Sequence, residues 1–198
     1  QCCHYDEKAC GDAVAFKRIP AEERLLAVLA DGLGHGLKAN ILALMTTTMA
    51  LRFSAEDREI VHSAEIIMDS LPVCRVRQIS YATFTIVDTR LGGITRVVEM
   101  GNPEFLLFRG GDELPVKGDE FASPKYQDRT MTAYTFQAQP NDRVLFFSDG
   151  VTQAGLGSPR FPLGWRNSGV SDYVKAQLAA SPDISAQELT ERILREAI

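Results

Sequence analysis

Short apolar runs at the start of the chain give way to a longer segment of helical periodicity. Residues Leu25 to Ala30 form a continuous apolar run between polar residues, and its length predicts a buried strand. Ala13 to Phe16 predicts a strand before it, and Pro20 between the two indicates a hairpin turn. After Gly36 the apolar residues recur at helical spacing instead. The chain is therefore expected to begin with a hairpin and to continue with helices.

Two helices are expected over residues 37–53 and 56–71, with Ser54 as a candidate N-cap of the second. Glycines and prolines make residues 110–129 irregular in this prediction. The C-terminal part is again helical, and Ser185 with a glutamate three residues later predicts the start of a last helix. Between the helical parts, β-branched and aromatic residues predict strands over residues 80–88, 94–100, 104–109, 131–137 and 143–148.

Strands occupy the middle of this pattern, and helices come in pairs beside them. The arrangement is typical of the α+β class, in which helix pairs cover antiparallel sheets. The chain has 198 residues, of which 45% are hydrophobic and 24% charged. These values suit one globular domain over residues 1–198.

Charge and hydropathy exclude several classes of function. A net charge of −5 leaves no basic surplus to neutralise phosphates, which argues against a nucleic-acid binder. No apolar run approaches the ~20 residues that a membrane span needs, and no signal-peptide pattern is present. We therefore expect a cytoplasmic protein without a membrane segment. The cysteines are too few for a disulfide scaffold and fit no common zinc spacing, so reduced thiols are expected at Cys2, Cys3, Cys10 and Cys74.

Two buried strands are each followed by an aspartate and a glycine, as Asp31-Gly32 and Asp149-Gly150. Asp12 stands at the entrance of the strand predicted over Ala13 to Phe16, and in a hairpin it would lie close to Asp31. Carboxylates that converge at the rim of an apolar core repel one another, and a hard cation such as Mg²⁺ or Mn²⁺ relieves that repulsion. Glycine at position 32 would also let a backbone carbonyl approach the ion. The other interpretation is that Asp-Gly is a common turn dipeptide.

His35 lies at the expected start of the first helix. It could donate a proton to a leaving group, but a locally hydrogen-bonded or solvated histidine is the interpretation we favour. The chain has neither a phosphate-binding loop of the Walker type nor a G-x-S-x-G elbow. Phosphate chemistry through a nucleotide loop and serine-hydrolase chemistry are therefore not indicated.

Four segments together resemble the SpoIIE-type bacterial serine phosphatases, which are similar to the metal-dependent (PPM, type 2C-like) protein phosphatases. The segments are Cys10 to Asp12, Val28 to Gly36, Gly101 to Pro103 and Phe147 to Thr152, in the family's order. The resemblance implies an αββα sandwich of two antiparallel sheets flanked by helix pairs. It also implies that the chain is a protein-serine/threonine phosphatase that acts in signal transduction.

The resemblance further implies a two-metal site for Mn²⁺ or Mg²⁺. Asp31 would bridge the ions, the carbonyl of Gly32 and the carboxylate of Asp12 would reach one of them, and Asp149 would hold the other. Asp12, Asp31 and Asp149 are then the catalytic residues. A water activated by both metals would attack the phosphorus of phosphoserine or phosphothreonine in line, without a covalent enzyme intermediate.

One departure from the family concerns the end of the chain. Members usually finish with a strand whose Asp-Asp/Asn-x-Thr motif supplies a further metal ligand, and no such motif precedes Ile198. We therefore expect the chain to lack that strand and motif and to bind the metal at Asp149 weakly.

The resemblance also implies partners. The substrate would be a phosphorylated protein in a partner-switching pathway, and the helices at 37–53 and 56–71 would contact a regulatory domain or a second copy. Core packing explains the apolar stripes of these helices equally well, and we favour it. Two alternatives stay open: a catalytically silent, phosphatase-like domain that binds a partner, and the same chemistry on a small phosphorylated metabolite. The second depends on whether residues 110–129 and 153–165 form a flat surface or a lid.

Overall fold

The computed structural model describes residues 9–56, 59–71, 82–123 and 129–197. The chain divides into two compact units. The first unit comprises Gln1–Asn102 and Val116–Ala138, and the second comprises Pro103–Pro115 and Gln139–Ile198. Each unit has a sheet, helices and a hydrophobic cluster of its own.

Over the described residues, the order of elements is two strands, two helices, seven strands and three helices, with one 3₁₀ turn, η1 (Pro20–Glu22), in the first hairpin. The helices are α1 (Gly36–Glu56), α2 (Ile60–Ser70), α3 (Asp149–Thr152), α4 (Arg166–Ala180) and α5 (Ala186–Ala197). The strands are β1 (Asp12–Ile19), β2 (Arg24–Gly32), β3 (Ala82–Arg90), β4 (Ile94–Met100), β5 (Leu106–Arg109), β6 (Asp112–Glu113), β7 (Gly118–Ala122), β8 (Thr130–Gln137) and β9 (Arg143–Leu145).

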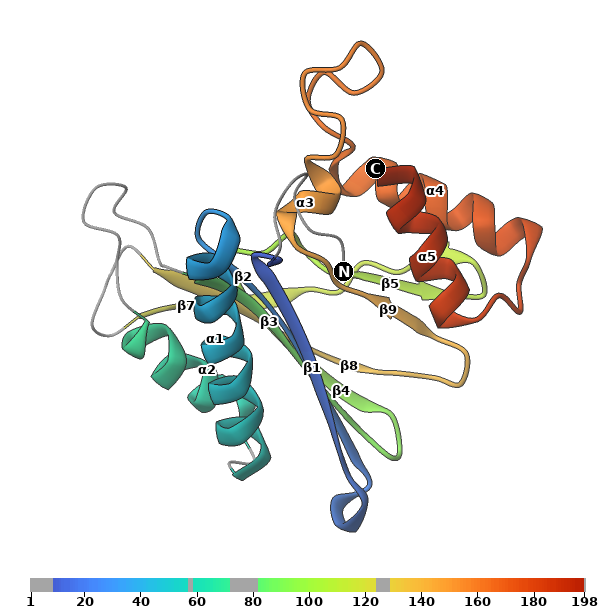
Figure 1. The fold of residues 1–198 in the computed structure, drawn as a ribbon. Coiled ribbons are helices and arrows are strands. Elements are labelled where there is room, and N and C mark those ends of the chain that lie inside the picture. The colour runs from blue at the N-terminus through green and yellow to red at the C-terminus, as the bar shows by residue number, and fades with distance from the viewer. Residues whose placement is uncertain (1–8, 57–58, 72–81, 124–128, 198) are drawn as a thin grey trace. The chain divides into compact units, whose positions relative to one another are not determined.

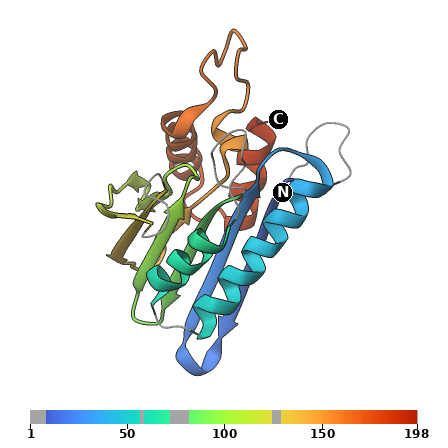
Figure 2. The same ribbon diagram turned by 90° about the vertical axis from the view of Figure 1, so that its left-hand side faces the viewer.

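The first unit is a six-stranded antiparallel sheet in the order β1-β2-β3-β4-β8-β7. Helices α1 and α2 cover one face of it, and α1 runs beside β1 and β2 (Figures 1 and 2). Alternate residues of β2 are buried, which is the period-2 pattern of a strand with one face on a core. The core between helices and sheet includes Val28, Ile60, Ile67 and Phe84, all fully buried.

Helix α1 packs on the sheet through its small residues. Ala39, Ala43 and Ala50 are fully buried, because the helix backbone lies very close to β2. The favoured expectation of core packing is confirmed for α2 and for Met49 and Leu51 of α1, which pack against the core. It is wrong for four large apolar residues of α1, which are exposed: Leu37 (68%), Ile41 (47%), Leu44 (50%) and Met45 (56%). We call these four residues the outer stripe of α1.

The boundary between α1 and α2 also differs from the prediction. Ser54 is not an N-cap, because it is buried within the last turns of α1. Its carbonyl oxygen accepts a hydrogen bond from the guanidinium of Arg24 at 2.7 Å, and Arg24 is paired with the buried carboxylate of Asp88. This buried pair fixes the end of α1 to the sheet, so the helix continues past the residue that local chemistry marks as a start.

The second unit is a three-stranded antiparallel sheet in the order β6-β5-β9, with helices α4 and α5 packed beside each other (Figure 1). Its core contains side chains from the sheet and from the helical part, including Phe108, Trp165, Val170 and Ile193. The predicted start of the last helix is confirmed, because the hydroxyl of Ser185 accepts a hydrogen bond from the Glu188 N–H at 3.1 Å.

Two sequence predictions about strands need correction. Residues 110–129 are not irregular throughout, because they contain β6 and β7. The strand predicted over 143–148 ends at Leu145. The α+β class with antiparallel sheets and helix pairs is confirmed.

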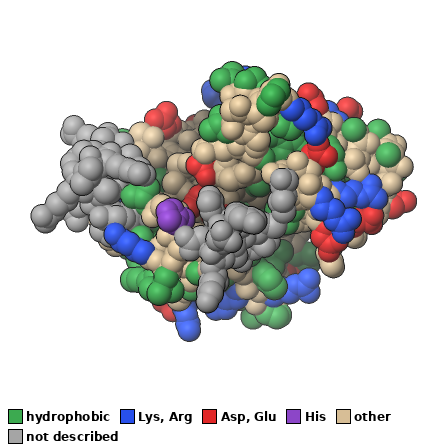
Figure 3. Space-filling view, turned by 45° about the horizontal axis from the view of Figure 1, so that its top comes forward, with side chains coloured by type: hydrophobic (Ala, Val, Ile, Leu, Met, Phe, Trp, Pro, Cys, Tyr) green, Lys and Arg blue, Asp and Glu red, His purple; other side chains and the backbone are tan. Residues whose placement is uncertain are grey.

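Two further findings concern the surface. Acidic and basic side chains are interspersed on the face shown in Figure 3, in keeping with the small net charge. Among the described residues, no helix combines the length and the apolar character that a membrane span requires.

Candidate functional site

The hairpin of β1 and β2 brings two aspartates together. Asp12, the first residue of β1, is the direct cross-strand partner of Asp31, near the end of β2. Side chains of directly opposed residues lie on the same face of a sheet, with their Cβ atoms about 5 Å apart. Both residues are partly exposed. The prediction that a hairpin places these carboxylates close together is therefore confirmed by the register.

Glycine at position 32 has a steric cause. A Cβ atom there would lie 2.0 Å from the carbonyl oxygen of Ala39, so any side chain would collide with the first turn of α1. The Gly32 N–H donates a hydrogen bond to the carbonyl of Gly11 at 3.1 Å. The segment before Asp12 and the segment after Asp31 are thus held against each other by the backbone.

The loop from β2 to α1 depends on glycine conformations. Gly34 and Gly36 have φ values of 93° and 73°, in the left-handed region that other residues rarely adopt. His35 between them is exposed and directly precedes α1. Its place at the start of the helix agrees with the sequence prediction.

The chemistry of this end of the hairpin suits a hard cation. Two carboxylates that face each other across a ladder destabilise the strand pair, and a divalent ion relieves that repulsion. Carboxylate and backbone carbonyl oxygens are the donors that Mg²⁺ and Mn²⁺ prefer. Asp12, Asp31 and Gly32 therefore fit a metal as a partial donor set. Within the described ranges, no cluster of three or more His, Cys, Asp and Glu side chains is placed to hold an ion.

Asp149 lies in the second unit, at the first position of the short helix α3. It is exposed, and its carboxylate accepts a hydrogen bond from the side-chain amide of Gln153 at 2.7 Å. The meeting of Asp149 with Asp31 at a second metal stays a prediction. Gln153 was missed by the sequence analysis, although its spacing of four residues on a helix is the signal that would have pointed to it.

Cys10 lies two residues before Asp12 and is disulfide-bonded. The expectation of a reduced thiol is therefore wrong for Cys10, and Cys2, Cys3 and Cys74 lie outside the described residues. The carbonyl of Cys10 accepts a hydrogen bond from the side chain of Asn40 on α1 at 2.8 Å. The segment before Asp12 is thus attached to α1 as well as to the end of β2. The sequence carried no signal for this contact.

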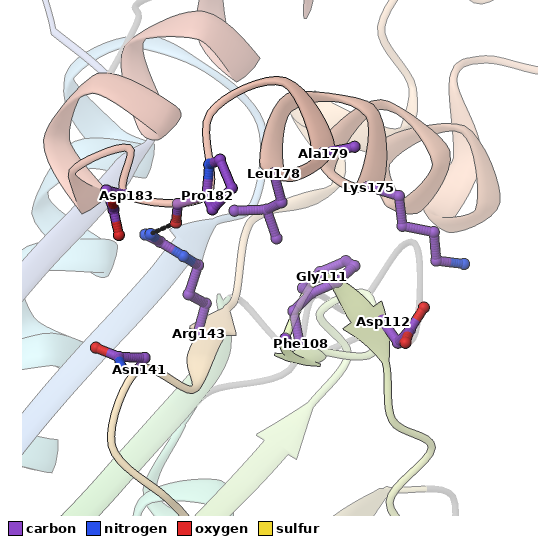
Figure 4. Close-up of a pocket in the computed structure, with 11 residues that line it drawn as sticks. Phe108, Gly111, Asp112, Asn141, Arg143, Lys175, Leu178, Ala179, Pro182 and Asp183 are labelled. Atoms are coloured by element: carbon purple, nitrogen blue, oxygen red, sulfur yellow. Dashed lines mark hydrogen bonds between the residues drawn. The ribbon is translucent and has the colours of Figure 1, made fainter.

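A cavity of about 650 Å³ lies in the second unit, between β5, β9 and α4 (Figure 4). Phe108 and Leu178 contribute apolar side chains to it, and Arg143 donates a hydrogen bond to the carbonyl of Pro182 at 3.1 Å. Arg143 begins β9, so the cavity lies at the end of that strand opposite to Asp149. It contains no facing pair of carboxylates and does not resemble the donor set at Asp12 and Asp31.

Several solved structures share the fold of this chain. The phosphatase domain with part of the regulatory domain of SpoIIE from Bacillus subtilis, of the PP2C type, aligns over 96% of this chain and 53% of its own, with a TM-score of 0.71 and 17% identity. The RsbU and RsbW domains of Rv1364c from Mycobacterium tuberculosis align over 98% of this chain and 51% of their own, with a TM-score of 0.69 and 19% identity. The chain thus spans about half the length of these two.

A third structure, RsbX in complex with magnesium, aligns over 87% of this chain and 82% of its own, with a TM-score of 0.57 and 20% identity. These likenesses show the fold, which is that of PP2C-type phosphatases. The chain belongs to the stage II sporulation protein E (SpoIIE) family, whose model matches residues 21–198. A comparison with the sequences of curated proteins gives no match.

Proposed function

We propose that the chain is a metal-dependent protein serine/threonine phosphatase whose substrate is a phosphorylated protein of a bacterial regulatory pathway. The observation that carries this proposal is the cross-strand pair of Asp12 and Asp31 beside Gly32, in a member of the SpoIIE family. Two facing carboxylates with an adjacent carbonyl form a partial donor set for a hard cation. Residues 1–198 would act as one phosphatase domain.

Asp31 would bridge two Mn²⁺ or Mg²⁺ ions, with Asp12 and the Gly32 carbonyl at one and Asp149 at the other. Bound there, the ions would supply an activated water and neutralise charge on the phosphoryl oxygens. The protein's own contribution is placement. The β1–β2 ladder fixes the separation of Asp12 and Asp31, and the contact of Gly32 with α1 fixes the carbonyl.

The test is hydrolysis of p-nitrophenyl phosphate with Mn²⁺ and with EDTA. We expect activity with Mn²⁺, none in EDTA, and a loss of at least about 100-fold in Asp31→Ala and Asp149→Ala. Asp183→Ala is the matched control, because Asp183 is an exposed carboxylate at the cavity of the second unit. Full activity in EDTA, or equal loss in the control, would contradict the proposal.

The outer stripe of α1 supports a protein partner for the same domain. Its four residues recur at helical spacing and are 47–68% exposed, while the opposite side of the helix packs on the sheet. Such a stripe suits the apolar face of a regulatory domain or of a second copy. It equally favours the alternative function, a phosphatase-like domain that binds a partner without turnover.

Variants of this stripe test partner binding, and turnover by the wild type separates the two functions. Ile41→Lys with Met45→Glu should leave the fold intact, because both side chains are exposed, and should abolish partner binding or self-association in sedimentation. Lys38→Glu, on the same helix and also exposed, is the control. Turnover with Mn²⁺ in the wild type would contradict the silent alternative, and its absence together with Mn²⁺ binding would favour it.

A further inference from the structure

The segment Gly101-Asn102-Pro103 has no role in the site described so far. It directly follows β4, and Gly101 has a φ of 75°. A Cβ atom at Gly101 would lie 2.6 Å from the γ-methyl of Thr83 on β3. Glycine is therefore required at this position both by the backbone conformation and by the lack of space beside Thr83.

Asn102 bridges two threonines of β3 with its side-chain amide. The hydroxyl of Thr83 donates to its oxygen at 2.5 Å, and its nitrogen donates to the hydroxyl of Thr85 at 3.0 Å. Thr85 is fully buried, whereas Thr83 is partly exposed. In the structure, the amide oxygen therefore accepts from Thr83, and the amide nitrogen donates to Thr85.

Thr83 is also the cross-strand neighbour of the candidate metal ligand. The register of β2 and β3 pairs it with Asp31, as the register of β1 and β2 pairs Asp31 with Asp12. The side chains of Asp12, Asp31 and Thr83 therefore form a row on one face of the sheet. Adjacent members of such a row have Cβ atoms about 5 Å apart, within reach of a hydroxyl–carboxylate hydrogen bond.

We propose that Asn102 is a positioning residue for Asp31, a role that rests on the proposed function. A threonine hydroxyl has a single proton. Thr83 donates its hydrogen bond to the amide oxygen of Asn102 and therefore not to the neighbouring carboxylate. Thr83 then does not compete with a cation for the oxygens of Asp31.

Removal of the amide changes the direction of the Thr83 hydrogen bond. Without the acceptor on Asn102, we expect the hydroxyl to turn toward the carboxylate of Asp31, its cross-strand neighbour. A hydrogen bond to an ionised carboxylate is stronger than a neutral one and competes with a cation for the same oxygens. The expected effect is weaker metal binding without loss of any ligand.

The experiment measures Mn²⁺ binding by isothermal titration calorimetry, which does not depend on turnover. Asn102→Leu should weaken the affinity roughly tenfold, the effect of one charge-assisted hydrogen bond. Thr83→Val alone should stay close to the wild type. The double variant Asn102→Leu/Thr83→Val should recover the affinity of Thr83→Val, because it contains no hydroxyl to redirect.

Two further variants separate this role from a structural one. Thr95→Val removes a buried hydroxyl that donates to Thr89 at 3.2 Å at the far end of the same strands, so it should lower the melting temperature and leave Mn²⁺ affinity unchanged. Asn102→Asp keeps an acceptor for Thr83 and should bind Mn²⁺ at least as tightly as the wild type, which tests the role even if the leucine variant does not fold.

Three outcomes would overturn the inference. The first is wild-type affinity in Asn102→Leu, the second is failure of the double variant to recover, and the third is weakened binding in Asn102→Asp. If the wild type itself binds no Mn²⁺, the proposed function fails first, and the role of Asn102 fails with it. The first outcome, in a protein whose wild type binds Mn²⁺ and hydrolyses p-nitrophenyl phosphate, would contradict the inference and leave the proposed function standing.

Discussion

The two Asp-Gly pairs of the chain lie in very different surroundings, although the first ends strand β2 and the second comes shortly after strand β9. Asp31 is paired across a ladder with Asp12, and Gly32 touches the backbone of α1. Asp149 is exposed on the short helix α3, and a Cβ atom at Gly150 would meet only the hydroxyl of Ser148, at 3.8 Å. The first pair is placed by packing between distant segments, and the second by hydrogen bonds of its own helix.

The difference shows that the same dipeptide can serve two physical purposes. Gly32 is required by space, because α1 starts against it and no side chain fits. At Gly150 the surrounding space is open, so packing does not require glycine at that position. We therefore expect changes at the first pair to affect both fold and metal binding, and changes at the second to act on metal binding alone.

The strongest test of the comparison exchanges each glycine for alanine. Gly32→Ala places a methyl group 2.0 Å from the Ala39 carbonyl and should lower the free energy of unfolding by at least ~3 kcal/mol, because a helix backbone cannot yield as a side chain does. Gly150→Ala should change it by less than about 1 kcal/mol. Urea unfolding followed by circular dichroism measures both. Similar values for the two variants would show that the packing at Gly32 is not what sets the pairs apart.

The next test removes one charge from each site. Asp31→Asn ends the repulsion with Asp12, so it should raise the stability of the metal-free protein by about 0.5 kcal/mol and weaken Mn²⁺ binding at least tenfold. Asp149→Asn should weaken Mn²⁺ binding without a gain in stability, because no carboxylate faces it across a ladder. Thermal melting with and without Mn²⁺ gives both quantities. A loss of stability in metal-free Asp31→Asn would contradict the idea of facing charges.

The elements of the fold were predictable to the extent that the local pattern decides them. The hairpin before Gly36 and the capped start at Ser185 depend on short-range chemistry, and both are found as predicted. The end of α1 was not predictable, because Arg24 and Asp88 come from other strands to hold it. The exposure of the outer stripe of α1 was not predictable for the same reason. The backbone of α1 lies so close to the sheet that small side chains such as alanine fit between them, and this approach depends on distant segments.

The candidate site divides in the same way. The closeness of Asp12 and Asp31 followed from the hairpin, because antiparallel strands place the start of one beside the end of the other. The hydrogen bond from Thr83 to Asn102 connects β3 with the turn that follows β4, and no spacing along the chain predicts it. Contacts that depend on the register of distant strands therefore need the structure.

A pH-dependent test concerns the strand that leads to Asp149. The guanidinium of Arg109 binds the Asp142 carboxylate at 2.9 and 2.7 Å, just before β9 begins, and this hydrogen bonding lowers the pKa of Asp142. The folded state thus favours the ionised form. The stabilisation is complete above the unfolded pKa of aspartate, about 3.9, and is lost as the pH falls through the lower folded pKa.

Asp142→Asn should therefore lower the melting temperature by roughly 3 °C at neutral pH, and the difference from the wild type should shrink below about pH 4. Asp172→Asn, which changes an exposed carboxylate on α4 of the same unit, is the control and should show a small difference at every pH. A difference that grows on acidification would contradict the assigned direction.

The smallest expected effect lies at Gln153. Its amide holds the Asp149 carboxylate at 2.7 Å within one helical turn, on an exposed surface where such a bond contributes little. Gln153→Ala should change Mn²⁺ affinity by no more than about threefold and leave the melting temperature unchanged. Gln187→Ala, which removes a similar exposed bond to Glu191 on α5, should change neither quantity. A tenfold loss of affinity in Gln153→Ala would mean that Asp149 is placed as strictly as Asp31, and the contrast between the two pairs would then not extend to metal binding.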